Sequence, residues 1–172
     1  MRKPEALSRL WAPWRMPYLK KITRQEKPGE CFFCGYAKAP ARDRENLVIL
    51  RGKACFTVLN RFPYAGGHLL VSPLAHKAEL GLLGPAEREE IFEQLARMQE
   101  AMDRLMRPQG YNVGANFGRA AGAGVPGHLH FHIVPRWNGD TNFMTTVADA
   151  RVLPQALSQL YAELQKALRN GR

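Results

Sequence analysis

The chain has 172 residues, of which 45% are hydrophobic, and this length suits one domain with short appendages. Its apolar runs are far shorter than the roughly 20 residues that span a bilayer, and no signal peptide is recognisable, so we expect a soluble cytoplasmic protein. Residues 1–53 carry +8 of the net charge of +10. This excess indicates either a solvated basic arm or a surface that attracts nucleotides or nucleic acid.

Residues 1–46 have the composition of an irregular arm, with five prolines and six aromatic side chains. Aromatic residues need somewhere to dock, so we expect this arm to lie over the domain or over a partner subunit. The arm contains Cys31 and Cys34, a C-x-x-C spacing that supplies half of a tetrahedral metal site. His76 and one histidine of a later strand could complete the site, whereas a redox pair or two buried thiols remain alternatives.

The remainder of the chain predicts an α+β fold. Five strands are expected, at Leu47–Leu50, Ala54–Leu59, His68–Ser72, Tyr111–Phe117 and along the histidine-rich segment 128–134. A long central helix begins at Pro85 and stops at Pro108, and a C-terminal helix follows Pro154. We therefore predict a mainly antiparallel five-stranded sheet with two helices. The expected division is an arm over 1–46, a domain over 47–144 and a helical extension over 145–172.

Three of the five histidines alternate with apolar residues, at His128, His130 and His132. In a strand they share one face, which we expect to stay open to a ligand while the other face packs on the core. His130 is the best nucleophile candidate, because a neutral imidazole nitrogen can attack phosphorus when a backbone carbonyl holds its other nitrogen as a donor. His132 could then donate to the phosphate. The preceding glycine-rich segment, Gly118–Gly127, is either a phosphate cradle or a set of tight turns.

The segment His128–Val134 resembles the H-φ-H-φ-H-φφ motif of the histidine triad (HIT) superfamily. Two further stretches are similar to family motifs, namely Asn60–Tyr64 with Gly67–Val71, and Asn116–Gly118 with Ala121 and Gly122. Trp11–Tyr18 and Pro135–Met144 resemble the bacterial branch described as diadenosine tetraphosphate (Ap4A) phosphorylases or hydrolases. The resemblance covers roughly residues 31–144, and it implies that the domain over 47–144 is a HIT catalytic domain.

The resemblance implies a homodimer whose two sheets join, with a nucleotide bound at each triad. It makes His130 the nucleophile that becomes nucleotidylated, His132 a phosphate contact and His68 a histidine that supports the site. The resemblance implies that Asn60 and Asn116 contact the substrate, and the glycine-rich segment adds Gly118, Gly122 and Gly124 as expected substrate-binding residues. Metal-containing relatives imply a structural zinc ion held by Cys31, Cys34, His76 and His128, and no organic cofactor is expected.

The expected function is a HIT-type nucleotidyl hydrolase or transferase that cleaves adenosine polyphosphates such as Ap4A. Water or inorganic phosphate would accept the nucleotide from His130. Two alternatives stay open: an adenosine phosphoramidate hydrolase, and a non-catalytic module that binds nucleotide or RNA through the basic arm. The chain departs from the family where Ala123 and Gly124 replace the usual Gln-Ser, so the sequence leaves the leaving-group acid open.

Overall fold

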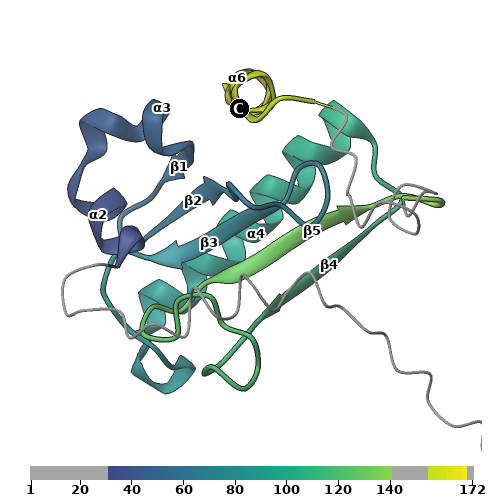
Figure 1. Cartoon of the computed structure of the whole chain (residues 1–172). Coiled ribbons are helices and arrows are strands. Elements are labelled where there is room, and N and C mark those ends of the chain that lie inside the picture. Colours follow the sequence, from purple (N-terminus) through teal and green to yellow (C-terminus); the bar gives the residue numbers. More distant parts are fainter. Residues whose placement is uncertain (1–30, 141–154, 170–172) are drawn as a thin grey trace, which may run out of the picture.

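The protein is described by a computed structural model that covers residues 31–140 and 155–169. Its centre is one five-stranded sheet with the strand order β1-β2-β3-β5-β4, in which every neighbouring pair is antiparallel (Figure 1). The strands are β1 (Val48–Arg51), β2 (Cys55–Leu59), β3 (Leu69–Pro73), β4 (Gly110–Ala115) and β5 (Phe131–Arg136). The predicted α+β class and the five-stranded antiparallel sheet are confirmed.

The helices of the described residues differ greatly in length. They are α2 (Phe32–Lys38), α3 (Asp43–Asn46), α4 (Pro85–Met106) and α6 (Leu157–Arg169), with 3-10 turns at Pro40–Arg42 and Leu80–Leu82. Helix α4 begins where expected, because Pro85 suits the first helical turn and the Glu87 carboxylate accepts the Gly84 N–H at 2.6 Å. It ends at Arg107, which adopts a left-handed conformation immediately before Pro108.

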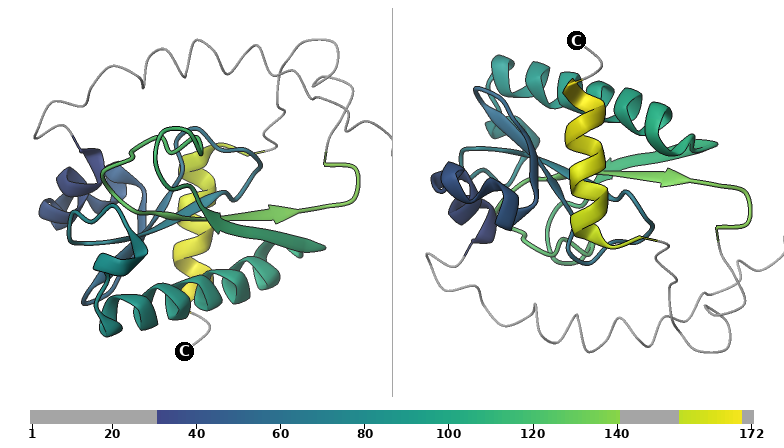
Figure 2. Two further views of the ribbon diagram at one scale, coloured as in Figure 1. Left: turned by 90° about the horizontal axis from the view of Figure 1, so that it is seen from below. Right: turned by 90° about the horizontal axis from the view of Figure 1, so that it is seen from above.

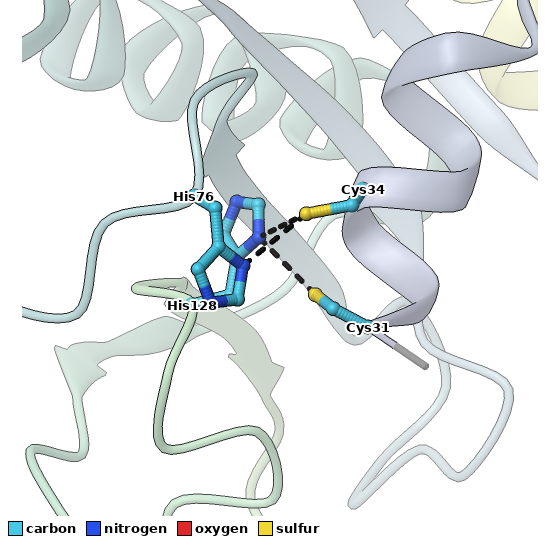
Figure 3. A group of neighbouring side chains, drawn as sticks. All are labelled: Cys31, Cys34, His76 and His128. Atoms are coloured by element: carbon cyan, nitrogen blue, oxygen red, sulfur yellow. Dashed lines mark hydrogen bonds between the residues drawn. The ribbon is translucent and has the colours of Figure 1, made fainter. Parts of the chain in front are cut away.

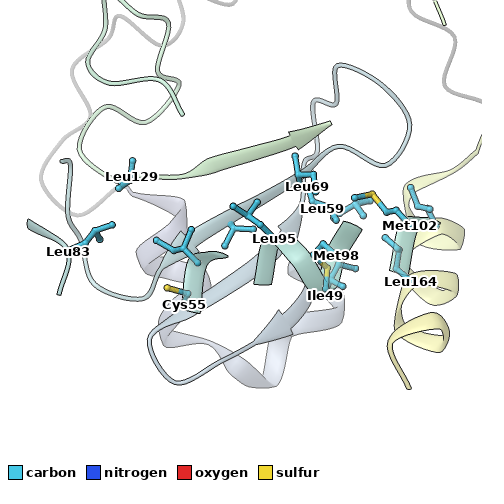
Figure 4. Close-up of a cluster of buried hydrophobic side chains, with 14 residues drawn as sticks. Ile49, Cys55, Leu59, Leu69, Leu83, Leu95, Met98, Met102, Leu129 and Leu164 are labelled. Atoms are coloured by element: carbon cyan, nitrogen blue, oxygen red, sulfur yellow. The ribbon is translucent and has the colours of Figure 1, made fainter. Parts of the chain in front are cut away.

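Helix α4 packs on one face of the sheet, α6 packs against α4 and beside strand β1, and both helices contribute to the main hydrophobic core (Figures 2 and 4). The apolar stripe of α4 supplies Ile91, Leu95 and Met98, all buried, against strands β2 and β3. Helix α6 presents Leu160 and Leu164 to the same core. These contacts fix the sheet, and the opposite face is left to carry the histidines.

The opposite face is covered by α2 and by the glycine-rich loop (Figure 2). The apolar side chains buried there are Cys31, Phe33, Val48, Phe56, Val58, Leu70 and Val125. The prediction of irregular backbone is therefore wrong for residues 31–46, which form α2, a 3-10 turn and α3. These helices depend on tertiary contacts, since Phe33 is fully buried and the Arg51 guanidinium donates to Asp43 and to the Tyr36 carbonyl oxygen.

Several sequence predictions concern residues outside the described ranges. These are the arm over 1–30 with its Trp11–Tyr18 motif, the Thr141–Met144 segment, and the start of the last helix at Pro154. The expected domain limits at residues 46 and 144 stay predictions. Within residues 31–140 and 155–169, no helix combines the length and apolarity that crossing a membrane requires.

Candidate active site and metal centre

The histidine segment enters the sheet later than predicted. Strand β5 begins at Phe131, so His128 and His130 precede the strand and only His132 lies in it. The side chains still alternate because hydrogen bonds to neighbouring segments hold residues 128–130 extended. The Leu129 N–H donates to the Lys77 carbonyl at 2.6 Å, and the Leu129 carbonyl accepts from Ser72 Oγ at 2.9 Å. The apolar residues between the histidines consequently face α4.

The imidazole face is less open than predicted. His128 is 0% exposed and His130 5% exposed, and only His132 is half-buried. The expectation of an open face is wrong because α2 packs Phe33 against both buried imidazoles. Its ring centroid lies 5.2 Å from that of His128 and 5.0 Å from that of His130. The environment of the predicted nucleophile is therefore largely dry.

The hydrogen bonding of His130 suits a nucleophile. Its Nδ1 lies 2.8 Å from the carbonyl oxygen of His128, which can only accept, so Nδ1 carries the hydrogen. In the neutral ring this leaves the lone pair on Nε2. Burial lowers the pKa of His130, although the hydrogen bond to the carbonyl opposes that effect. The ring is accordingly neutral near pH 7, with Nε2 able to attack an electrophile.

A chain of hydrogen bonds sets the tautomer of His132. The Tyr64 backbone N–H donates to His68 Nδ1 at 3.1 Å, so His68 carries its hydrogen on Nε2. His68 Nε2 lies 2.9 Å from His132 Nδ1 and donates to it. The hydrogen of His132 must then be on Nε2, which is buried and has no partner among the described residues. Burial and the neighbouring His130 lower the pKa of His132 to about 4, so this N–H belongs to a neutral ring.

The other predicted substrate-binding residues lie in the loops that border the histidines. Asn60 contacts His68, because its Nδ2 lies 3.2 Å from His68 Nδ1, and its Oδ1 accepts the Phe62 N–H at 2.9 Å. In the glycine-rich loop, Asn116 Nδ2 donates to the Gly122 carbonyl at 3.5 Å. Positive φ values at Gly118 (74°) and Gly122 (85°) explain why glycine occupies both turns, and Gly124 lies in the next bend.

The four predicted metal ligands converge, although they come from three separate parts of the chain (Figure 3). Cys31 precedes α2 and Cys34 lies in its first turn, His76 follows β3, and His128 precedes β5. Their sulfur and nitrogen atoms all lie within 4.8 Å of one another. Cys31 Sγ is 3.3 Å from His128 Nδ1, and Cys34 Sγ is 3.2 Å from His76 Nδ1. The structure thus selects His128 as the strand histidine that joins the cluster.

This donor set fits zinc. Two thiolates and two imidazoles are a common tetrahedral ligand set, in which neighbouring sulfur and nitrogen atoms lie about 3.6 Å apart. His128 is oriented for ligation, because its Nε2 donates to the Pro73 carbonyl at 2.9 Å and its Nδ1 lone pair faces the thiols. Burial lowers the pKa of His128 to about 4 and raises that of Cys31 to about 11. Binding a metal would therefore require a neutral His128, which is already favoured, and release of the Cys31 proton.

Sequence reasoning missed three groups that shape the site. The composition of the arm marks Phe33 only as one aromatic residue among six, yet its position between the two cysteines of the C-x-x-C motif places its ring against His130. The Tyr64 backbone N–H starts the hydrogen-bond chain to His132, and the Pro73 carbonyl orients His128. Backbone groups have no signal in side-chain patterns, whereas the position of Phe33 within the motif was visible.

Comparisons with known proteins agree with this geometry. The family model described as HIT domain matches residues 41–139. An AP-4-A phosphorylase of Mycobacterium tuberculosis is 38% identical over 162 residues, which are 89% of this chain and 80% of that protein. A Schizosaccharomyces pombe asymmetrical bis(5'-nucleosyl)-tetraphosphatase is 32% identical over 93 residues, or 54% of this chain and 50% of that protein. The crystal structure of a Zn-bound histidine triad family protein from Mycobacterium smegmatis superposes with a TM-score of 0.66 at 26% identity, covering 82% of this chain and 94% of that one.

Proposed function

This chain belongs to the HIT domain family, and we propose that it is a nucleotidyl hydrolase or phosphorylase that cleaves adenosine polyphosphates such as Ap4A. The curated relatives support this class of enzyme and a nucleotide substrate. The observation that carries the proposal is the opposite tautomers of two adjacent imidazoles. His130 keeps a lone pair on Nε2, and His132 keeps an N–H on Nε2 that has no partner within residues 31–140 and 155–169. A phosphate group needs both an attacking atom and a donor for its oxygens.

The proposed reaction has two displacements at one phosphorus atom. His130 Nε2 attacks the α-phosphorus, a P–N bond forms, and the P–O bond to the departing nucleotide breaks. Water or inorganic phosphate then attacks the same phosphorus, the P–N bond breaks, and His130 is restored. With Ap4A the first step releases ATP, and the second gives AMP with water or ADP with phosphate. The His132 Nε2–H and the amides of the glycine-rich loop would stabilise charge on the phosphate oxygens.

A zinc ion bound at the proposed metal site would have a structural role. The four residues that would hold it are Cys31, Cys34, His76 and His128. Four protein ligands leave no coordination position for a water, so a bound zinc ion would supply cross-linking of the chain rather than chemistry. None of the three cysteines forms a disulfide bond, which is typical of a reducing compartment, and we include a cytoplasmic location in the proposal.

We also propose that two copies of the chain pair through β4. In the described residues β4 is hydrogen-bonded to β5 alone, so its outer edge is unpaired. Val113 on β4 is 52% exposed, and Phe92 on α4, which is 66% exposed, lies beside Phe131 of the neighbouring strand β5, with ring centroids 6.4 Å apart. Pairing of β4 with its copy would join the two sheets into one. Light scattering should give twice the mass of the chain, and a monomer at all concentrations would refute the pairing.

The experiment that tests the function is incubation of the purified protein with Ap4A, with and without inorganic phosphate, followed by separation of the nucleotides. ATP with ADP, formed only when phosphate is present, would identify a phosphorylase. ATP with AMP in both conditions would identify a hydrolase. Absence of products would refute the proposal and favour a phosphoramidate substrate or a binding module.

Replacing His130 tests its role as the nucleophile. His130→Ala should lower turnover at least about 1000-fold, since no other described group occupies the attacking position. Mass spectrometry of reactions that are stopped without acid should show one nucleotidyl group on the wild-type chain and none on the variant. A folded variant with a near-normal rate would remove His130 as the nucleophile.

A further inference from the structure

Phe33 is the one aromatic side chain of the described residues that contacts both His128 and His130. It is fully buried, and its ring is tilted by 35° from that of His130, with the two ring centroids 5.0 Å apart. Its neighbour Phe32 lies on the same helix but is 41% exposed. The two rings contact each other, with centroids 4.2 Å apart, but only the Phe33 ring is in contact with the predicted nucleophile.

The His130 ring needs more than its hydrogen bond to be fixed. The bond from Nδ1 to the His128 carbonyl holds one orientation of the ring, yet rotation about the side-chain torsions χ1 and χ2 could break this bond. Rotation would turn Nε2 away from the phosphorus. On one side the ring meets His132, with centroids 5.1 Å apart, and on another it meets Phe33. Phe33 thereby restricts the remaining freedom of the ring and keeps water from its buried side.

The position of Phe33 depends on the two cysteines that flank it. Helix α2 has only seven residues, and its N-cap residue, Cys31, makes no side-chain capping bond. A helix this short is held by its contacts rather than by its own stability. Cys31 and Cys34 contact His128 and His76 instead, so the metal-binding cluster anchors the turn of helix that carries Phe33.

Resting on the proposed function, we propose that Phe33 is a positioning residue for His130 and that the C-x-x-C cluster acts on catalysis through it. The ring holds Nε2 of His130 in the direction of attack, and ligation of the flanking cysteines fixes the ring. The metal cluster thus influences the reaction without contacting the substrate. Phe33 itself makes no bond to the nucleotide.

The test compares Phe33→Ala and Phe33→Leu with the matched control Phe32→Leu in the full-length, zinc-loaded protein, because leucine at position 32 keeps an apolar side chain beside Phe33. Single-turnover kinetics on Ap4A give the rate of nucleotidylation and the half-saturating concentration separately. Phe33→Ala should lower the rate about 10–100-fold and change the half-saturating concentration less than about 3-fold. Phe33→Leu, which keeps most of the apolar volume, should restore part of the rate, and Phe32→Leu should keep the wild-type rate.

Nitrogen-15 NMR of labelled histidines gives a readout that a purely structural role would not change in folded protein. The wild type should show His130 in one tautomer with hydrogen on Nδ1, and Phe33→Ala should show a mixture. Unchanged rate and tautomer in folded Phe33→Ala would overturn the inference, even if its melting temperature falls. Absence of turnover in the wild type would refute the proposed function. It would not refute the positioning of His130 by Phe33, because the tautomer measurement tests that positioning without substrate. An equal loss of the rate in Phe32→Leu and Phe33→Leu would also overturn the specific role of Phe33.

Discussion

At one end of the histidine row His128 meets two thiols and His76, and at the other end His132 meets His68 and the loop that carries Tyr64. Both imidazoles are neutral, with pKa values lowered to about 4 mainly by burial. Their hydrogens nevertheless lie on the same nitrogen for opposite reasons. His128 donates from Nε2 to a backbone carbonyl, whereas His132 receives a hydrogen bond at Nδ1 and its Nε2–H is unpaired in the part of the chain that the structure describes.

The difference shows that the partner of one ring nitrogen decides the use of the other. A carbonyl partner at Nε2 directs the Nδ1 lone pair of His128 toward the cysteines, where it can bind a metal. A carbonyl partner at Nδ1 gives His130 a free lone pair at Nε2. An imidazole partner at Nδ1 makes His132 a donor. Three identical side chains thus acquire a ligand, a nucleophile and a donor role from their backbone and side-chain neighbours.

The largest effect on stability is expected from Cys31→Ser, which removes one ligand of the proposed metal cluster at His128. Loss of one of four ligands should abolish stoichiometric zinc binding and lower the free energy of unfolding by about 3 kcal/mol, which corresponds to about 10 °C in melting temperature. Turnover per folded, metal-free molecule should fall much less than in His130→Ala. Elemental analysis and calorimetry measure both quantities.

Cys55→Ala is the matched control for that experiment. Cys55 is also a buried thiol, and burial raises its pKa to about 12, but it lies in the α4 core outside the cluster. The control should lose some stability through its cavity and retain full zinc content. An unchanged zinc content in Cys31→Ser would disprove the assignment of the ligands.

A smaller effect is expected from His68→Leu, which removes the hydrogen-bond donor to His132. Without a donor at His132 Nδ1, the hydrogen of His132 is free to occupy either nitrogen, and its Nδ1 becomes a buried unpaired group. Turnover should fall about 10–100-fold, equivalent to about 1–3 kcal/mol, while zinc content stays at the wild-type value. His68→Gln, whose amide can donate, should recover part of the rate. If zinc binding changed in parallel with turnover, the two ends would not be independent.

Much of this arrangement could be predicted because it depends on side-chain type and spacing. Alternation placed Leu129 in the core and the histidines on the other side, even though the strand begins only at Phe131. The long helix was predictable because its apolar stripe and terminal signals extend over many residues. The cluster ligands were predictable because few cysteines and histidines exist in the chain.

The short helices and the burial of the triad could not be predicted in the same way. Helix α2 has too few residues for a periodic pattern, and its conformation depends on the packing of Phe33 against the face of the sheet opposite α4. That packing closes the face around His130 that alternation alone left open. The tautomers depend on backbone groups of Tyr64, Pro73 and His128, whose positions follow from the tertiary structure.

The smallest expected effect is a loss of folding stability at acid pH that an ordinary histidine in place of His132 would not cause. The groups that face it are His130, His68 and Tyr64, and its pKa of about 4 in the folded protein lies below its usual value near 6.5. Because the pKa is lower in the folded state, the unfolded chain binds the proton first. The contribution of His132 to stability is therefore complete above pH 6.5 and is lost as the pH falls toward 4. Between pH 7 and 5 the wild type should lose about 1 kcal/mol more than His132→Gln, after allowance for the partial exposure of the ring. Urea unfolding of both proteins at the two pH values measures this difference, and equal losses would show that His132 has an ordinary pKa in the folded protein.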